Sequence, residues 1–241
     1  DDRLHFVRPG GKTDILRRGL LPAPFHLFGS LVGFGGLDAR DKWSLIRTLT
    51  ALRRERHRAD LDRLTMGQWL SSKGATPRAF EHFWRPILVS ALNEDPERAS
   101  AAPAFQVFLD GLMATRDSFE MGVPAVPLAD LYSAALEQTL GSGVHVCLRS
   151  TVERIDPADR QADFYVSAVP FERVNTLIPG LDLRLDRFEH SPITGIHLWF
   201  DRPLTGLPHA VLLDGTLQWL FRKSENYYQA VVSASRSLLT L

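Results

Sequence analysis

Hydrophobic and polar positions in the first half of the chain alternate mainly with the spacing of amphipathic helices. Four apolar side chains follow one another at three-residue intervals, namely Trp43, Ile46, Leu49 and Leu52. This stripe predicts a helix over residues 39–58 that turns these side chains toward a core. Asp38 precedes the helix and is suited to cap it, because its carboxylate can accept hydrogen bonds from the free N–H groups of the first turn.

Capping and proline signals predict the other helices. Thr65 and Gln68 have the spacing of a capping box and begin a short helix. Pro77 suits the first turn of another helix, which Pro86 should then kink or interrupt because proline lacks a backbone N–H. Further helices are expected from Pro103 onward, over residues 128–140 and over residues 171–177.

Runs of β-branched and aromatic residues predict strands at the start of the chain and after residue 143. The first two strands form a hairpin around Pro9-Gly10-Gly11. Strands are expected at residues 4–8, 13–16, 144–148, 151–155, 164–169, 193–200, 210–213, 217–221 and 227–233, with a hairpin turn at Asp214-Gly215. The chain is therefore predicted to be an α+β protein with a helical first half and a strand-rich second half.

Prolines and glycines predict irregular chain between the first hairpin and the first long helix. Pro22 and Pro24 indicate an extended loop over residues 20–27, and residues 30–36 are expected to form a small-residue connection. The segment Gly33–Asp38 is not predicted to bind a dinucleotide, because Asp38 stands where the last glycine of that fingerprint belongs.

Composition and charge exclude several classes of protein. The 241 residues are 44% hydrophobic and 23% charged, which is ordinary for a globular protein and excludes a disordered chain or a coiled coil. Lys and Arg number 28, as do Asp and Glu, so net charge indicates no nucleic-acid partner. A single cysteine, Cys147, excludes an internal disulfide framework. No apolar run reaches the length of a membrane span, and no pair of histidines has metal-ligand spacing, so no metal site is predicted.

Basic and aromatic clusters leave two interpretations open. The run from Arg53 to Arg58 could contact phosphates or anionic lipid headgroups, or it could be a solvated helix end. Six aromatic residues could line an apolar cavity or pack in the core, namely Phe80, Phe83, Trp84, Phe105, Phe108 and Phe119. His197 alternates with Trp199 along a strand, which favours packing or a local hydrogen bond over metal ligation.

Several segments, in chain order, resemble one family of enzymes. They are Leu21–Leu27, Phe83–Leu88, Ala91–Glu94, Ser191–Thr194, His197–Pro203 and Gln218–Phe221. Together they resemble the squalene-associated FAD-dependent desaturases, or hydroxysqualene dehydroxylases, of the phytoene desaturase and amine oxidase superfamily. The resemblance implies an FAD-dependent oxidoreductase of hopanoid biosynthesis that reductively dehydroxylates hydroxysqualene to squalene. A carotenoid or phytoene-type desaturase and a non-catalytic isoprenoid-binding module remain the alternatives.

The resemblance also implies a division of the chain. Residues 1–116 would form the mainly helical part of a substrate domain, residues 117–175 a remnant of an FAD-binding domain of amine-oxidase type, and residues 176–241 the strand-rich part of the substrate domain. The 241 residues contain neither the N-terminal glycine fingerprint nor the second flavin motif of the superfamily. We therefore expect this stretch alone to be inactive and to bind little flavin.

The resemblance and the residue types together nominate a site. Arg85 and Asn93 are predicted to be catalytic, as donors that assist departure of a hydroxyl or position the flavin. The alternative is that Arg85 pairs with a carboxylate such as Glu94 and that Asn93 caps its helix. The other predicted residues are substrate-binding Phe83, Trp84 and Trp219, and cofactor-binding Val152, Ala168 and Pro170.

The same resemblance and residue types lead to expectations about partners and cellular location. We expect a long-chain isoprenoid substrate, no nucleic acid, and a cytoplasmic protein that contacts the inner face of the bacterial membrane peripherally. This membrane contact would use the apolar loop 20–28 and the arginines of residues 1–63, a segment with 13 basic and 8 acidic side chains. The sequence predicts no oligomeric state.

Overall fold

The computed structural model describes residues 1–140, 142–159 and 162–239 and divides the chain into two compact units. The first unit comprises residues 1–122 and 191–241, and the second comprises residues 123–190. The predicted segment 117–175 covers most of the second unit, whose boundaries lie later at both ends. Its assignment to an FAD-binding domain stays a prediction.

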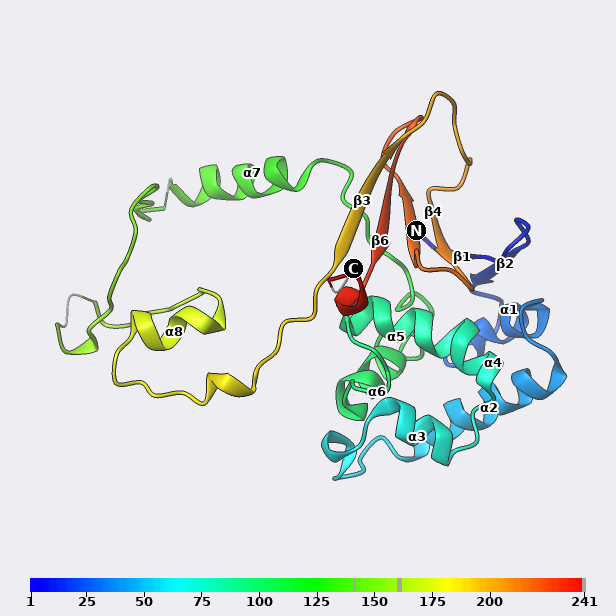
Figure 1. Cartoon of the computed structure of the whole chain (residues 1–241). Helices are drawn as coiled ribbons and strands as arrows, with labels where there is room; N and C mark the ends of the chain where they lie inside the picture. Colours follow the sequence, from blue (N-terminus) through cyan, green and yellow to red (C-terminus); the bar gives the residue numbers. More distant parts are fainter. Residues whose placement is uncertain (141, 160–161, 240–241) are drawn as a thin grey trace. The chain divides into compact units, whose positions relative to one another are not determined.

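A six-stranded sheet joins the two ends of the chain in the first unit (Figure 1). Its strands are β1 (Arg3–Val7), β2 (Thr13–Arg17), β3 (Thr194–Trp199), β4 (His209–Leu212), β5 (Trp219–Arg222) and β6 (Tyr227–Val232). Their order is β2-β1-β4-β5-β6-β3, and β1 runs parallel to β4 while every other pair is antiparallel. Gly10 and Gly11 turn the first hairpin with positive φ angles of 81° and 78°, which glycine adopts without steric cost.

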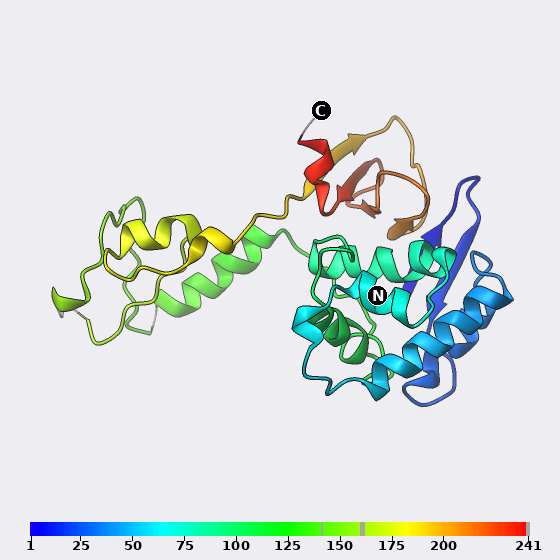
Figure 2. The same ribbon diagram turned by 60° about the horizontal axis from the view of Figure 1, so that its bottom comes forward.

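The helices of the first unit lie together on one side of its sheet (Figures 1 and 2). They are η1 (Phe25–Leu27), α1 (Phe28–Gly33), α2 (Ala39–Arg54), η2 (Leu61–Arg63), α3 (Met66–Ser72), α4 (Pro77–Ala79), the π turn η3 (Phe80–Trp84), α5 (Arg85–Leu92) and α6 (Ala101–Leu109), with η6 (Ser235–Leu238) near the end of the chain. Two predicted caps are confirmed. Asp38 and Asp41 cap each other's backbone at the start of α2, and Thr65 and Gln68 do the same for α3.

Helix α2 begins where predicted, but it ends at Arg54 and presents a different face to the core. The buried side chains include Leu45, Thr48 and Leu52, whereas Trp43 is 67% exposed. The stripe therefore faces the core only at Leu49 and Leu52, whereas Trp43 and Ile46 are exposed. A second set of residues has the same helical spacing, and only contacts with other elements decide which set is buried.

The helix that contains Pro86 is interrupted, as predicted, but it does not end there. The chain stays helical from Pro77 to Leu92, and the backbone passes through the π turn η3 directly before α5. Pro86 is the second residue of α5, and its missing N–H costs little in the first turn after the interruption. Helix α6 likewise begins two residues before the predicted Pro103, because the Ser100 hydroxyl caps it by accepting from Ala102 N–H.

The segment expected to be extended contains helical structure instead. Residues 25–33 form η1 and α1, so the proline signals predicted too much loop. The glycine-rich segment that follows serves a buried carboxylate. Gly35 and Gly36 donate backbone hydrogen bonds of 2.7 and 3.0 Å to Asp14, which also pairs with Arg8. This arrangement satisfies Asp14 where it is removed from water.

The main hydrophobic core lies between the sheet and the helices. Phe6, Leu16 and Val211 contribute from the strands, and the helices contribute large aromatic side chains. The Trp69 ring meets Phe105 edge-on with ring centroids 4.8 Å apart. Each such fully buried side chain contributes roughly 1.5–3 kcal/mol to the free energy of unfolding. Among the predicted aromatic set, core packing is the role of Phe83, Trp84, Phe105, Phe108 and Phe119.

The second unit has helices but no strands among its described residues. It contains α7 (Leu128–Leu140), η4 (Pro157–Asp159), α8 (Phe171–Leu177) and η5 (Leu185–Arg187). The segments predicted as strands at residues 144–148, 151–155 and 164–169 form no strand and pair with no other described strand, so those predictions were wrong. A strand needs hydrogen bonds to a neighbouring strand, and β propensity alone cannot supply them.

The described helices also bear on membrane insertion. None of them combines the length and the apolar character that a segment needs to cross a lipid bilayer.

Candidate functional site

A row of aromatic rings covers one face of three neighbouring strands in the first unit. We define this aromatic shelf as His197 and Trp199 of β3, Tyr227 of β6, and Trp219 and Phe221 of β5. The register pairs Trp199 with Tyr227, and it pairs both His197 and Phe221 with Gln229 of β6. Because residues two apart on a strand point to the same face, all five rings share one side of the sheet.

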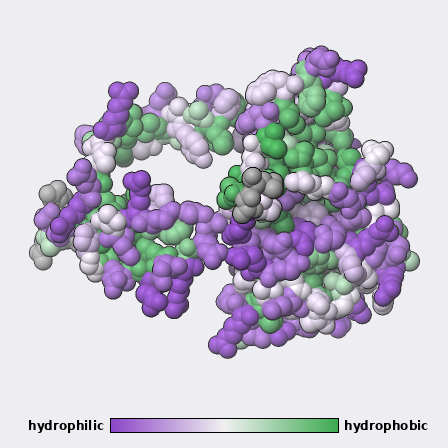
Figure 3. Space-filling model, viewed as in Figure 1, coloured by the Kyte–Doolittle hydropathy of each residue, from purple (hydrophilic) through white to green (hydrophobic). Residues whose placement is uncertain are grey.

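The rings of the shelf stack in parallel and are open to solvent at one end. Trp199 and Tyr227 have centroids 4.9 Å apart and planes inclined by 8°, and Trp219 and Phe221 lie 5.4 Å apart at 6°. Trp199 is 71% exposed within the described chain. Figure 3 shows hydrophobic residues over the strands of the first unit, in addition to the shelf, because tryptophan, tyrosine and histidine are not hydrophobic on its colour scale. Contiguous exposed apolar surface of this kind marks sites where ligands or partners bind.

The other end of the shelf is anchored in the helical layer. The indole N–H of Trp219 donates to the Ser90 hydroxyl on α5. The buried His209 ring lies 6.0 Å from Trp219 and 5.4 Å from His5. Burial, reinforced at His5 by the neighbouring His209, lowers the pKa of both imidazoles below the usual 6.5, so they are neutral at pH 7. These contacts hold Trp219 in one position relative to α5.

One polar pair stands on the shelf. His197 Nδ1 lies 2.6 Å from the Tyr227 hydroxyl, and its ring stacks on Trp199 and Tyr227, so His197 both packs and forms a local hydrogen bond, the two roles that the sequence favoured over metal ligation. A phenol bonded to an imidazole can hold or pass a proton between them. The shelf therefore combines apolar ring faces with a single proton-handling group.

Arg85 lies on α5 and is held by acidic side chains. Its guanidinium pairs with Glu81, Asp95 and Glu97, with the closest atoms 3.0, 2.5 and 2.9 Å apart. It also lies over the ring of Phe80 at 4.9 Å. Because opposite charges surround it, these carboxylates raise the pKa of Arg85, although its partial burial opposes them. The carboxylates are not Glu94, which pairs with Arg236 instead.

Asn93 terminates α5 in the left-handed conformation, with φ 51° and its N–H bonded to Val89 O. Its side chain joins two distant segments. Asn93 Nδ2 donates to Ser191 O at 2.5 Å, and its Oδ1 accepts from Ala234 N–H at 2.8 Å. The structure thus places both Arg85 and Asn93 in structural contacts, and their catalytic role stays a prediction.

The predicted substrate-binding residues occupy two different environments. Phe83 and Trp84 are buried in the core, where the Trp84 ring meets Phe108 edge-on at 4.4 Å. Trp219 lies on the aromatic shelf. Phe83 and Trp84 therefore support the helical layer beneath the shelf, and only Trp219 belongs to its surface.

The predicted cofactor-binding residues lie in the second unit. Val152 is 60% exposed, and neither its backbone N–H nor its C=O has a hydrogen-bond partner among the described residues. Ala168 is exposed, and Pro170 precedes the first turn of α8. Directly before Ala168, Ser167 Oγ is buried without a partner among the described residues. The exposed backbone of Val152 leaves polar atoms available to a ligand.

The described residues show no cluster suited to a metal ion, since no three His, Cys, Asp or Glu side chains gather there.

No family model matches the chain. The chain is 22% identical over 250 residues to 15-cis-phytoene desaturase of Synechococcus elongatus, covering 92% of this chain and 52% of the relative. It is 26% identical over 172 residues to hydroxysqualene dehydroxylase of Sinorhizobium fredii, covering 64% of this chain and 40% of the relative. The chain thus spans about half the length of these curated relatives.

A solved structure has a similar fold. A redesigned cofactor-binding variant of putrescine oxidase matches 100% of this chain and 60% of its own, with a TM-score of 0.63 and 14% identity. The similarities support the amine oxidase and phytoene desaturase superfamily. The predicted α+β class is confirmed, and the structural match shows that the fold is shared with an amine oxidase.

Of the five shelf residues, the sequence predicts only Trp219 to belong to the site. It places His197 and Trp199 on one strand without assigning them to the site. Tyr227 and Phe221 were missed, although each alternates with a buried neighbour on its strand. The signal was present in that alternation, but only the pairing register shows that three strands place their rings on one face.

Proposed function

We propose that this chain forms the substrate-binding part of an FAD-dependent oxidoreductase that converts hydroxysqualene to squalene. The aromatic shelf is the observation that carries this proposal. It brings together two of the segments that resemble hydroxysqualene dehydroxylases, His197–Pro203 and Gln218–Phe221. A long apolar chain can lie across these ring faces, because burying apolar area on both partners favours binding.

The proposed cofactor is FAD, which when bound and reduced supplies a hydride. The second unit supports this assignment. The unpaired backbone of Val152 fits the polar edge of an adenine ring, and the extended chain at Ala168 and Pro170 can run beside a dinucleotide. Many large apolar side chains of this unit are exposed, among them Val152, Phe164 and Val166. Such surface suits contact with a cofactor or with additional strands.

The shelf residues have separate tasks in the proposed reaction. The Tyr227–His197 pair gives a proton to the substrate hydroxyl, so the C–O bond breaks and the oxygen leaves as water. The ring faces of Trp199 and Trp219 stabilise the positive charge that develops on carbon. A hydride of the kind that reduced FAD would supply would then complete the exchange, so that one proton and one hydride replace the hydroxyl by hydrogen and release water.

Two other functions remain candidates. The similarity to 15-cis-phytoene desaturase extends over 92% of this chain and favours an oxidative desaturase that uses the same shelf for a carotenoid precursor. A non-catalytic isoprenoid-binding module would need the shelf without the Tyr227–His197 pair.

Product analysis separates these candidates. The intact enzyme is supplied with FAD, a reductant and hydroxysqualene, and the extract is analysed by gas chromatography and mass spectrometry. Squalene that forms only with reduced FAD supports the dehydroxylase. A more conjugated product from phytoene with an oxidant favours the desaturase. Quenching of tryptophan fluorescence by either isoprenoid without any product favours the binding module.

A further inference from the structure

A groove in the first unit lies away from the aromatic shelf, between α1 and α2. It has a volume of about 720 Å³. Phe25, Phe28 and Leu31 form one wall, Ile46 and Leu49 of α2 form the other, and Met113 also lines it. Phe25 is 59% exposed. The groove is therefore apolar and open to solvent.

Other large apolar side chains of the neighbouring segments are exposed as well. Leu20 is 97% exposed, and Leu21 and Val32 are also exposed. Trp43 projects from α2 into solvent instead of into the core. A patch of large apolar side chains that no described residue covers is costly in water, and it marks a surface that meets a partner or a membrane.

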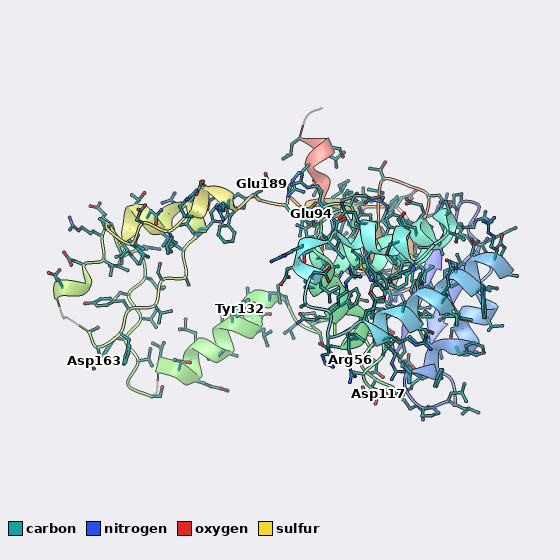
Figure 4. All side chains as sticks on the ribbon, turned by 90° about the horizontal axis from the view of Figure 1, so that it is seen from below. Arg56, Glu94, Asp117, Tyr132, Asp163 and Glu189 are labelled. Carbon is teal, nitrogen blue, oxygen red and sulfur yellow. The ribbon has the colours of Figure 1, made fainter. Side chains whose placement is uncertain are left out.

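Basic side chains border the groove. Arg53 and Arg54 end α2, and Arg56 and His57 follow it, with Arg56 labelled in Figure 4. None of these three arginines has a carboxylate within ion-pair distance among the described residues. Arg58 is different, because it pairs with Glu55 and Asp60. The rim of the groove therefore carries uncompensated positive charge.

We propose that this groove docks the protein on a bilayer that contains anionic phospholipid. The apolar side chains enter the acyl region, and Arg53, Arg54 and Arg56 bind the phosphates of the headgroups. A solvated helix end explains cations near the last turn of α2, but it does not explain exposed Phe25 and Phe28 beside them. Apolar insertion joined to cationic attraction is how proteins attach to membrane surfaces without spanning them. This inference goes beyond the proposed function and does not depend on flavin or on a substrate.

Vesicle binding tests the inference with the full chain. Flotation is measured with neutral phosphatidylcholine vesicles and with vesicles that also contain phosphatidylglycerol. We expect binding to the anionic vesicles only, weakened by salt. Each arginine near an anionic surface strengthens partitioning roughly fivefold, so Arg53→Gln, Arg54→Gln and Arg56→Gln together should reduce it on the order of 100-fold.

A matched variant controls for charge. Arg63→Gln, Arg222→Gln and Lys223→Gln remove three exposed cations elsewhere in the first unit and should leave binding to anionic vesicles nearly unchanged. Phe25→Ala with Phe28→Ala should reduce binding to the same vesicles, whereas Phe188→Ala should not. Circular dichroism spectra confirm that each variant is folded.

Three results would overturn the inference. They are equal binding to neutral and anionic vesicles, no binding to either, and equal loss in the groove variant and the charge control. A fourth such result is release of the protein from anionic vesicles by millimolar inorganic phosphate at constant ionic strength, because it would show a site for a soluble anion. A negative result in the vesicle experiment would leave the product analysis of the proposed reaction unaffected.

Discussion

His82 Nε2 lies 2.9 Å from Asp214 Oδ1, and this contact joins the π turn before α5 to the hairpin turn between β4 and β5. The other ring nitrogen, Nδ1, lies 3.0 Å from Gly36 O. His82 is buried, and Asp214 has a positive φ of 60°. One side chain thus connects three segments that are far apart in the sequence, at the junction of the helical layer and the sheet.

Removing this imidazole should destabilise the first unit. We expect His82→Ala to lower the free energy of unfolding by about 1–2 kcal/mol, because it leaves Gly36 O and Asp214 without their partner. Asp214→Asn should cost less, since asparagine tolerates positive φ and still offers an oxygen. Thermal unfolding checks both variants, with the exposed His57→Ala as control. An unchanged melting temperature in His82→Ala would contradict the assigned role.

Acid should destabilise the protein through its buried histidines. His26 is fully buried against Phe119, and neither ring nitrogen has a hydrogen-bond partner among the described residues. Burial lowers the pKa of His26 below its usual 6.5, as it does for His5 and His209. The unfolded chain therefore binds more protons than the folded one once pH falls below about 6.5, so stability is full above that pH and declines below it.

The measurement is the melting temperature between pH 7.5 and pH 5. His26→Phe should flatten the decline, because it removes one group that must gain a proton on unfolding. His57→Gln changes an exposed histidine and should leave the slope as it is. A His26→Phe curve parallel to that of the natural chain would show that His26 does not contribute to the acid sensitivity.

Asn93→Ala should lower the melting temperature. The substitution removes the side-chain bonds to Ser191 and Ala234 and places alanine at a positive φ, and together these effects cost about 1–3 kcal/mol. Asn93→Gly isolates the side-chain contribution, because glycine accepts the same backbone conformation.

Arg85→Gln should also destabilise the protein, because it leaves Glu81, Asp95 and Glu97 without their shared cation. Turnover measured beside melting temperature and flavin content decides whether Arg85 and Asn93 do more. Loss of turnover at unchanged stability and flavin content would support a catalytic role. Wild-type turnover in both variants would remove them from the mechanism.

The hydroxyl of Tyr227 should matter for chemistry more than for binding. Tyr227→Phe keeps the stacked ring but removes the group bonded to His197, so kcat should fall on the order of 100-fold with little change in KM. Trp199→Ala should instead raise KM, because it removes ring area from the shelf. Tyr132→Phe on α7 removes a hydroxyl from an exposed tyrosine and serves as the matched control (Figure 4). Equal kcat in both tyrosine variants would exclude Tyr227 as proton donor.

Local interactions account for what the sequence determined by itself. The Asp38 cap, the Thr65–Gln68 capping box, the first hairpin and the last four strands of the chain lie close to their predicted positions. Each depends on residues a few positions apart, whose hydrogen bonds and spacing are readable in the sequence. The resemblance that indicated the superfamily is likewise carried by short contiguous segments.

Contacts between distant residues decided the rest. Only tertiary structure turned Leu45 and Leu52 of α2 inward and left Trp43 in solvent, because both faces of that helix have helical spacing. It paired β1 with β4 in parallel across some two hundred residues, and it left the predicted strands of the second unit without partners. The aromatic shelf and the arginine-rimmed groove arose in the same way. Each is assembled from segments whose burial and register depend on neighbours that no local pattern specifies.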